Sequence, residues 1–250
     1  MCAFCPADAV EKGGEHIWDN WINKALPKMM YRATEHLAPD APIIRYDTPS
    51  LSKQFPVVCD RCNNGWMSVL TDKFKQTFSR TVLDGEPFTL SPRDAALLVS
   101  FTFMKAVVTS HGIDDEPFFT RAARETFRTS QAIPPGIKGW FAAFEGISRM
   151  NTKNNILIVS SDEGILRGKE FLSYSYVVGK LVIQLVAPRW KNVTDRGKPL
   201  VSLSPAAWWN DSVTRFWPGD GNLVLWPPSK HFADDTIQIF IDRFSNPVNL

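Results

Sequence analysis

The chain has 250 residues, of which 44% are hydrophobic and 22% charged, a composition typical of a globular protein that buries its own core. Its formal net charge is only +2, which excludes a strongly basic nucleic-acid-binding chain and requires any positive surface to be local. The N-terminus lacks a secretory pattern, and the longest apolar run (95–108) is too short for a membrane span, so we expect a cytoplasmic protein without a membrane partner.

The first 80 residues mix short apolar pieces with turn-forming residues. A glycine pair predicts a turn, after which Glu15 and His16 should begin a strand. Asp19 can cap a short helix that ends at Pro27. The four prolines within residues 38–56 predict loop or extended chain there.

A longer helix is predicted from near Asn63 to just before Gly85. Large apolar residues recur every four positions along it, which is the pattern of a buried helical stripe, at Trp66, Leu70, Phe74 and Phe78. The DGEP stretch at 84–87 then predicts a domain boundary, which divides the chain into domains 1–82 and 83–250.

The second domain is predicted to mix helices and antiparallel strands. Ser91, Pro92 and Asp94 form a typical helix start. The patterns predict helices over 91–110 and 118–129, and strands over 155–160, 171–178, 181–187 and 222–228, with a hairpin turn at Gly179-Lys180. Residues 234–244 can be helix or strand. The expected fold class is therefore α+β.

All four cysteines occur as two Cys-x-x-Cys pairs, Cys2 with Cys5 and Cys59 with Cys62. Four thiolates at this spacing match a tetrahedral structural zinc site, which would tie the N-terminus to a loop-rich, proline-rich segment. Alternatives are redox-active thiol pairs or unpaired thiols, although a reducing compartment favours a metal over disulfides.

Glu15 and His16 follow the first cysteine pair, and Asn63 and Asn64 directly follow the second. Neighbouring residues on a strand point to opposite faces, so a carboxylate could hold a metal ion while an imidazole activates water. Either asparagine could be a helix N-cap or an oxygen ligand for a hard cation such as Mg²⁺. A lone histidine is more often an ordinary surface or core residue.

These strings, CAFC, GEHIWDNWI and VVCDRCNNGW, resemble the HNH endonucleases of the ββα-metal superfamily, in the subgroup braced by a four-cysteine zinc. They also resemble uncharacterised bacterial and phage HNH-like proteins in which a stretch like CNNGWM follows the second cysteine pair. The resemblance covers residues 1–80. It implies an N-terminal ββα-metal module on a structural zinc, about 1–82, followed by a mixed helix and antiparallel-strand domain of unknown function.

The resemblance implies a metal-dependent endonuclease that hydrolyses phosphodiester bonds of DNA. His16 matches the general base. Glu15 and Asn63 match ligands of one catalytic Mg²⁺ or Mn²⁺ ion. Phosphate contacts are expected from nearby polar and basic residues, namely Arg61, Asn64, Lys73 and Lys75.

Three positions depart from the family pattern. Glu15 replaces the usual Asp, Gln54 lies where a middle Asn is expected, and Trp66 stands where a basic residue is usual. The rival reading is a catalytically inactive zinc-containing module that binds nucleic acid or protein. The second domain could recognise a target, a protein partner or a signal; a role in phage defence or as a toxin is an analogy.

Overall fold

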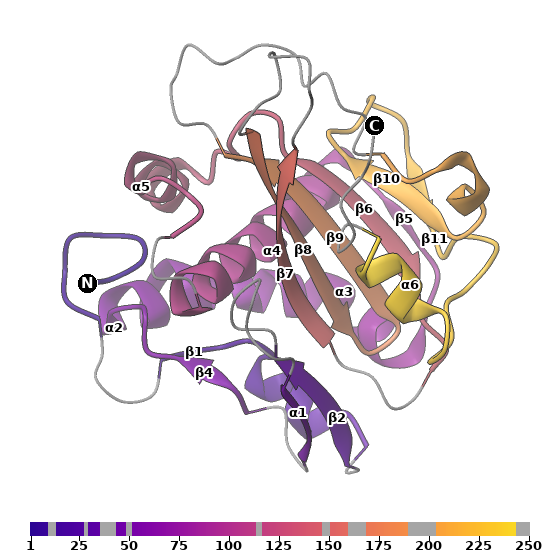
Figure 1. Cartoon of the computed structure of the whole chain (residues 1–250), viewed down its shortest axis with the longest axis horizontal. Helices are drawn as coiled ribbons and strands as arrows, with labels where there is room; N and C mark the ends of the chain where they lie inside the picture. Colours follow the sequence, from indigo (N-terminus) through magenta and orange to yellow (C-terminus); the bar gives the residue numbers. More distant parts are fainter. Residues whose placement is uncertain are drawn as a thin grey trace.

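The structure is a computed structural model of the whole chain. It describes residues 1–9, 14–27, 30–35, 44–48, 52–113, 117–146, 151–159, 169–189 and 204–243. Parts of the predicted proline-rich loop and the end of the predicted strand at 155–160 lie outside these ranges. Over the described residues the protein is a mixed α+β fold with antiparallel sheets, as its sequence predicts (Figure 1).

The largest sheet has five antiparallel strands in the order β10-β6-β9-β8-β7. They are β10 (Val213–Trp217), β6 (Lys138–Ala143), β9 (Leu181–Pro188), β8 (Lys169–Val178) and β7 (Asn151–Val159). The predicted hairpin at Gly179 is confirmed. Gly179 has φ of 54°, and a Cβ there would lie 2.0 Å from the Val82 carbonyl oxygen, so the close approach requires glycine.

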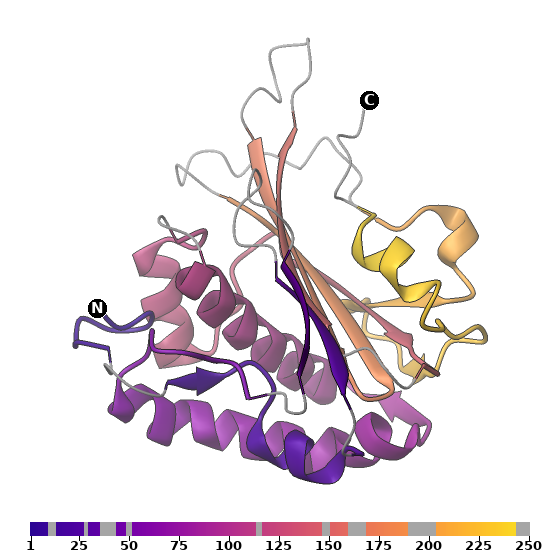
Figure 2. The ribbon, with the colours of Figure 1, turned by 60° about the horizontal axis from the view of Figure 1, so that its bottom comes forward.

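Two long helices pack on one face of this sheet (Figure 2). α4 (Pro92–Ile113) lies between the sheet and α3 (Ser68–Asp84), which explains why α4 is apolar nearly all round. Its predicted start is confirmed, since the Asp94 backbone N–H donates to Ser91 Oγ at 3.2 Å. α4 is the one described helix long and apolar enough to cross a membrane, and 78% of that stretch is buried within the protein.

Further helices and strands surround these two layers. α5 (Arg121–Ser130) begins three residues later than predicted, because Thr120 rather than a residue near 118 provides the N-cap. The others are β1 (Glu15–His16), α1 (Asn20–Ala25), β2 (Tyr31–Glu35), β3 (Ile44–Thr48), β4 (Gln54–Phe55), α2 (Asp60–Cys62), β5 (Phe88–Leu90), β11 (Val224–Trp226) and α6 (Ile237–Ile241), with a π-helical segment (Asn63–Met67) and a 3-10 turn (Ala207–Trp209). Three two-stranded pairs complete the topology: β1 with β4, β2 with β3, and β5 with β11.

Several strands were not predicted from the sequence. β6 and β10 are the clearest cases, and both belong to the large sheet. The segment KGWFAA of β6 has no polar alternation, because both of its faces are buried, and so it lacks the period-two signal of a half-exposed strand. The C-terminal segment that could be helix or strand contains the short helix α6.

The apolar core runs across the predicted domain boundary. One cluster of buried side chains includes Phe4 near the N-terminus, Phe74 on α3, Phe101 on α4 and Tyr176 on β8. The rings of Phe74 and Phe101 stack with centroids 3.8 Å apart. Among the described residues, side chains before and after residue 82 therefore share one core. The division into two domains at residue 82 stays a prediction from the sequence. A second, smaller cluster lies between the opposite face of the sheet and α6.

Candidate functional site

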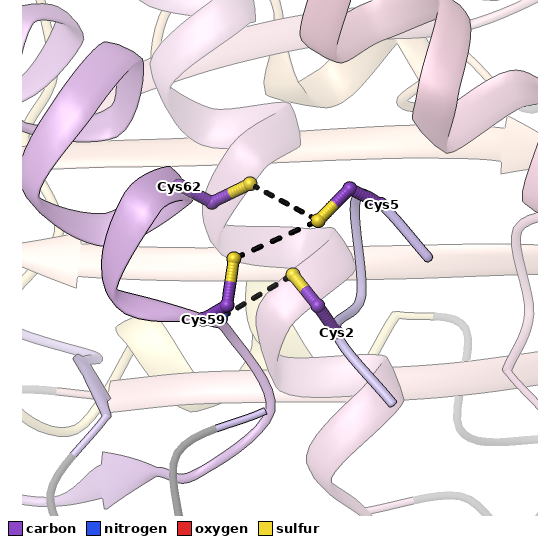
Figure 3. A group of neighbouring side chains, drawn as sticks. All are labelled: Cys2, Cys5, Cys59 and Cys62. Carbon is purple, nitrogen blue, oxygen red and sulfur yellow. Dashed lines mark hydrogen bonds between the residues drawn. The ribbon is translucent and has the colours of Figure 1, made fainter. Parts of the chain in front are cut away.

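The four cysteine sulfurs converge on one point (Figure 3). All four Sγ atoms lie within 4.8 Å of one another. Cys5 Sγ is 3.6 Å from Cys59 Sγ and 3.8 Å from Cys62 Sγ. Zn–S bonds of about 2.3 Å in tetrahedral geometry place sulfurs about 3.8 Å apart, so the spacing fits a four-thiolate metal site. The convergence of both pairs favours a metal site over two separate redox pairs.

The chain conformation around the cysteines also suits thiolates. Cys2 Sγ accepts contacts from two backbone N–H groups, that of Phe4 at 3.5 Å and that of Cys59 at 3.3 Å. The Ala3 N–H donates to the Val57 carbonyl at 2.7 Å, which joins the two cysteine segments directly. Backbone N–H donors stabilise charge on sulfur, so the first cysteine pair is prepared for a bound cation.

The thiols affect one another's ionisation. Burial raises the pKa of Cys5 and of Cys62. Burial opposes ionisation of Cys59 as well, yet the Cys62 backbone N–H and the neighbouring thiols outweigh it and lower the Cys59 pKa. Four buried thiolates without a cation would repel one another. A coordinated divalent cation compensates their negative charge and so favours the deprotonated form of each cysteine.

Trp66, where the resembled family has a basic residue, has an apolar role in this protein. Its ring packs edge-on against Phe4, with centroids 5.0 Å apart, and against Phe127 at 5.6 Å. Phe4 lies between Cys2 and Cys5, so Trp66 anchors the first cysteine pair on the helix that follows the second. This position contributes apolar packing.

Helical structure begins earlier than predicted. Cys59 is the N-cap residue of α2, and helical conformation starts at Asp60 rather than near Asn63. The N-cap reading of Asn63 is therefore wrong, because its backbone is already helical. Gly65 has non-helical dihedral angles, which kink the chain within the π-helical segment before α3 begins.

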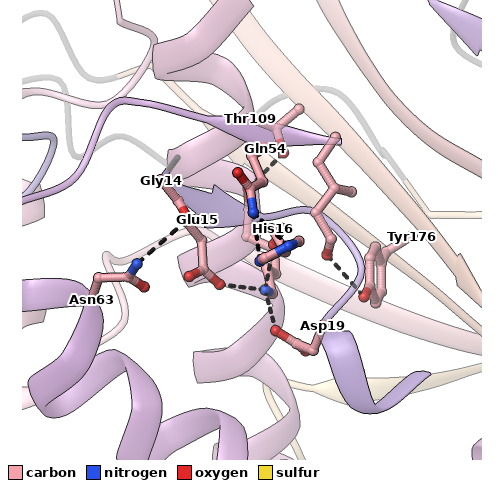
Figure 4. Close-up of polar contacts among 10 residues, drawn as sticks. Gly14, Glu15, His16, Asp19, Gln54, Asn63, Thr109 and Tyr176 are labelled. Atoms are coloured by element: carbon pink, nitrogen blue, oxygen red, sulfur yellow. Dashed lines mark hydrogen bonds and ion pairs between the residues drawn. The ribbon is translucent and has the colours of Figure 1, made fainter. Parts of the chain in front are cut away.

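The Asn63 side chain reaches the start of strand β1. Its Nδ2 donates to the Gly14 carbonyl oxygen at 3.5 Å (Figure 4). Gly14 has φ of 120°, and a Cβ there would lie 2.1 Å from the Phe55 carbonyl oxygen, so the close approach of the chain to β4 requires glycine. β1 pairs antiparallel with β4, with His16 opposite Gln54. The structure thus brings Asn63 beside the Glu15–His16 strand.

Glu15 lies in a buried ion cluster that the sequence did not predict. The Lys105 ammonium, from α4, is 2.5 Å from Glu15 Oε1 and 2.7 Å from Asp19 Oδ1. Its third contact is the His16 carbonyl oxygen at 2.7 Å. The Lys105 side chain is only 1% exposed. One oxygen of the proposed ligand Glu15 is therefore occupied by an internal cation.

Asp19 stands at the N-cap position of α1, as predicted, but its side chain does not cap that helix. It accepts from Lys105 instead. Burial raises the Asp19 pKa, although Lys105 opposes this shift. Burial disfavours the ammonium of Lys105, yet Asp19 and Glu15 outweigh it and raise the Lys105 pKa, so that the side chain stays charged.

His16 is half-buried, and its ring lies against Gln54 (Figure 4). Gln54 Nε2 is 2.5 Å from His16 Nε2 and 3.3 Å from Nδ1. Burial and then the positive charge of Lys105 lower the His16 pKa, against the opposing effect of Asp19. The lowered pKa favours the neutral imidazole, the form in which the ring can accept a proton.

The four predicted phosphate-contacting residues are exposed along α2, the π-helical segment and α3. They follow the second cysteine pair in sequence and are Arg61, Asn64, Lys73 and Lys75. Their exposure is compatible with contact to a large ligand.

Sequence reasoning missed Lys105 and the link from Asp19 to it. A signal existed, because Lys105 is the one charged residue in the apolar run 95–108, where a cation needs a buried partner. The partner could not be inferred, since Glu15 precedes Lys105 by 90 residues.

Comparison with known proteins identifies no relative: the sequence matches no protein-family model, and neither curated proteins nor solved structures match it.

Proposed function

We propose that residues 1–82 form a zinc-braced HNH-type nuclease module that hydrolyses phosphodiester bonds of DNA with the help of a divalent cation. The supporting observation is the adjacency of Asn63 to the Glu15–His16 strand, next to a four-cysteine cluster that fits a metal. Two antiparallel strands before a helix are expected of a ββα-metal module. In this chain β1 pairs with β4 ahead of the helical segment that begins at Asp60, and α1, β2 and β3 lie between the two strands.

Each proposed role suits the chemistry of its side chain. Glu15 and Asn63 offer oxygen ligands, which Mg²⁺ and Mn²⁺ prefer. When bound, such an ion stabilises negative charge on the scissile phosphate and its leaving oxygen. His16 takes a proton from the attacking water, for which it must be neutral beforehand. Gln54 contacts the His16 ring and can hold its orientation.

The structural zinc has a separate role in this proposal. It joins the chain segment before β1 to the segment that opens the helix, so that Asn63 and Gly14 meet although 49 residues separate them. Four-thiolate sites are closed to substrate, which suits a purely structural ion.

A second candidate is a zinc-containing module that binds nucleic acid or protein without cleaving it. The observation that favours it is the Lys105 ammonium between Glu15 and Asp19, because an internal cation competes with a divalent ion for the Glu15 carboxylate. The two candidates differ in a plasmid-nicking assay of the purified protein with Mg²⁺ or Mn²⁺. Metal-dependent nicking supports the nuclease; retention of DNA in a mobility-shift assay without cleavage by either metal supports the binding module.

Asn63→Ala should raise the Mn²⁺ concentration needed for half-maximal nicking by at least about 10-fold, because the variant loses a proposed oxygen ligand. The matched control is Asn64→Ala, which removes the adjacent, exposed amide. It should leave the Mn²⁺ requirement unchanged and act only on the affinity for DNA. Equal Mn²⁺ requirements in the wild type and Asn63→Ala would remove Asn63 from the proposed ligand set.

A further inference from the structure

Lys105 is the most deeply buried charged side chain near the proposed site, and its three contacts match its chemistry. An ammonium group has three N–H donors and no acceptor. Lys105 directs them to Glu15 Oε1, the His16 carbonyl oxygen and Asp19 Oδ1. A fully used set of donors holds its partners in one geometry.

The acceptors all lie within residues 15–19, whereas Lys105 belongs to α4. Two of them belong to Glu15 and His16, the residues to which the proposed chemistry assigns a metal ligand and a general base. Other contacts from the large sheet reach the same segment: the Tyr176 hydroxyl donates to the Ile17 carbonyl at 3.1 Å, and Trp18 Nε1 donates to the Val177 carbonyl at 3.3 Å. The part of the chain beyond residue 82 therefore holds this short strand from several directions.

We propose that Lys105 is a positioning residue that fixes the Glu15 carboxylate and the His16 backbone, so that the site of the N-terminal module is complete only when α4 packs against it. The inference rests on the proposed nuclease function for its catalytic consequence. A two-residue strand has few contacts of its own, and the ammonium holds the Glu15 carboxylate and the His16 carbonyl in fixed positions. A misplacement of about 1 Å at a catalytic site costs about 100-fold in rate.

The variant for the test is Lys105→Met combined with Asp19→Asn. Lys105→Met alone leaves two buried carboxylates without a cation and can fail to fold. In the wild type, one lysine and two carboxylates give the cluster a net charge of −1. In the double variant only the Glu15 carboxylate remains, so the net charge of the cluster is again −1. Asp19→Asn alone keeps the Lys105–Glu15 pair. Thr102→Val controls for changes to α4, because Thr102 is buried on the same helix and donates to the Leu98 carbonyl.

Two measurements are made on the zinc-loaded chain of 250 residues. Steady-state nicking should show that kcat falls about 100-fold in the double variant while KM for DNA changes by less than about threefold. Asp19→Asn and Thr102→Val should keep wild-type kcat. Hydrogen exchange should become faster at the amides of 15–19 in the double variant and stay unchanged across 68–84, which shows that the effect is local.

Wild-type kcat together with wild-type exchange at 15–19 in the double variant would overturn the inference. An equal loss of kcat in Asp19→Asn would also overturn it, because Asp19 rather than Lys105 would then be responsible. The exchange measurement separates this inference from the proposed function. If the wild type cleaves no DNA, the nuclease proposal fails, and exchange at 15–19 still decides whether Lys105 holds the strand.

Discussion

His16→Ala is expected to lower the rate of plasmid nicking by about 10²–10⁴-fold, the usual contribution of a general base. The residual activity reflects charge stabilisation at the phosphate, which does not require the imidazole. KM for DNA should change little, because His16 acts on the attacking water rather than on the nucleic acid. The measurement is kcat and KM for nicking of supercoiled plasmid at saturating Mg²⁺ or Mn²⁺.

The matched control for this variant is His231→Ala. His231 is another histidine with a polar partner on its ring: its Nδ1 lies 2.5 Å from Glu145 Oε1, and it lies outside the proposed module. Its loss should leave nicking unchanged. Metal-dependent nicking by His16→Ala at the same rate as by the wild type would show that His16 is not the general base.

Cys62→Ser is expected to remove the structural metal and to unfold the N-terminal part of the protein. Zinc binding to four-ligand peptide sites contributes about 10–16 kcal/mol of apparent free energy at pH 7, which is comparable to the whole stability of an ordinary domain. Cys62 is 1% exposed and its Sγ lies 3.8 Å from Cys5 Sγ, so a serine there also leaves a polar group against the remaining thiols. The purified wild type should contain about one zinc per chain.

Elemental analysis and thermal unfolding measure the two consequences together. The control is Arg61→Ala, which changes an exposed residue between the cysteines of the second pair and should keep its zinc and its melting temperature. Because the apolar core continues from Phe4 to Trp226, we expect the loss of zinc to lower the stability of the whole chain. A Cys62→Ser protein with wild-type zinc content, or a zinc-free wild type with an unchanged melting temperature, would contradict the structural metal site.

Local patterns predicted the helices well, because each depends on residues close in the chain. The apolar stripe of α3 is confirmed in the burial of Leu70, Phe74 and Phe78. The start of α4 at Ser91 and the end of α3 at Gly85, which has φ of 73°, follow from capping chemistry alone. Strand β6 escaped prediction because KGWFAA has neither polar alternation nor a β-branched residue, whereas the equally buried β9, LVIQLVAP, contains valine and isoleucine and was predicted.

The sequence by itself determined that the cysteines form two pairs of thiols and that Glu15, His16 and Asn63 adjoin them, because the spacing of thiols and the order of residues are properties of the chain. Only the tertiary structure decided that the four sulfurs meet at one point and that Asn63 reaches Gly14. It also decided that the buried Lys105 is joined to Glu15 and Asp19. A buried charge needs an oppositely charged partner, and the packing of the core decides which residue supplies it. The partners of Lys105 lie 86 and 90 residues away along the chain, so their closeness in space could not be inferred from the sequence.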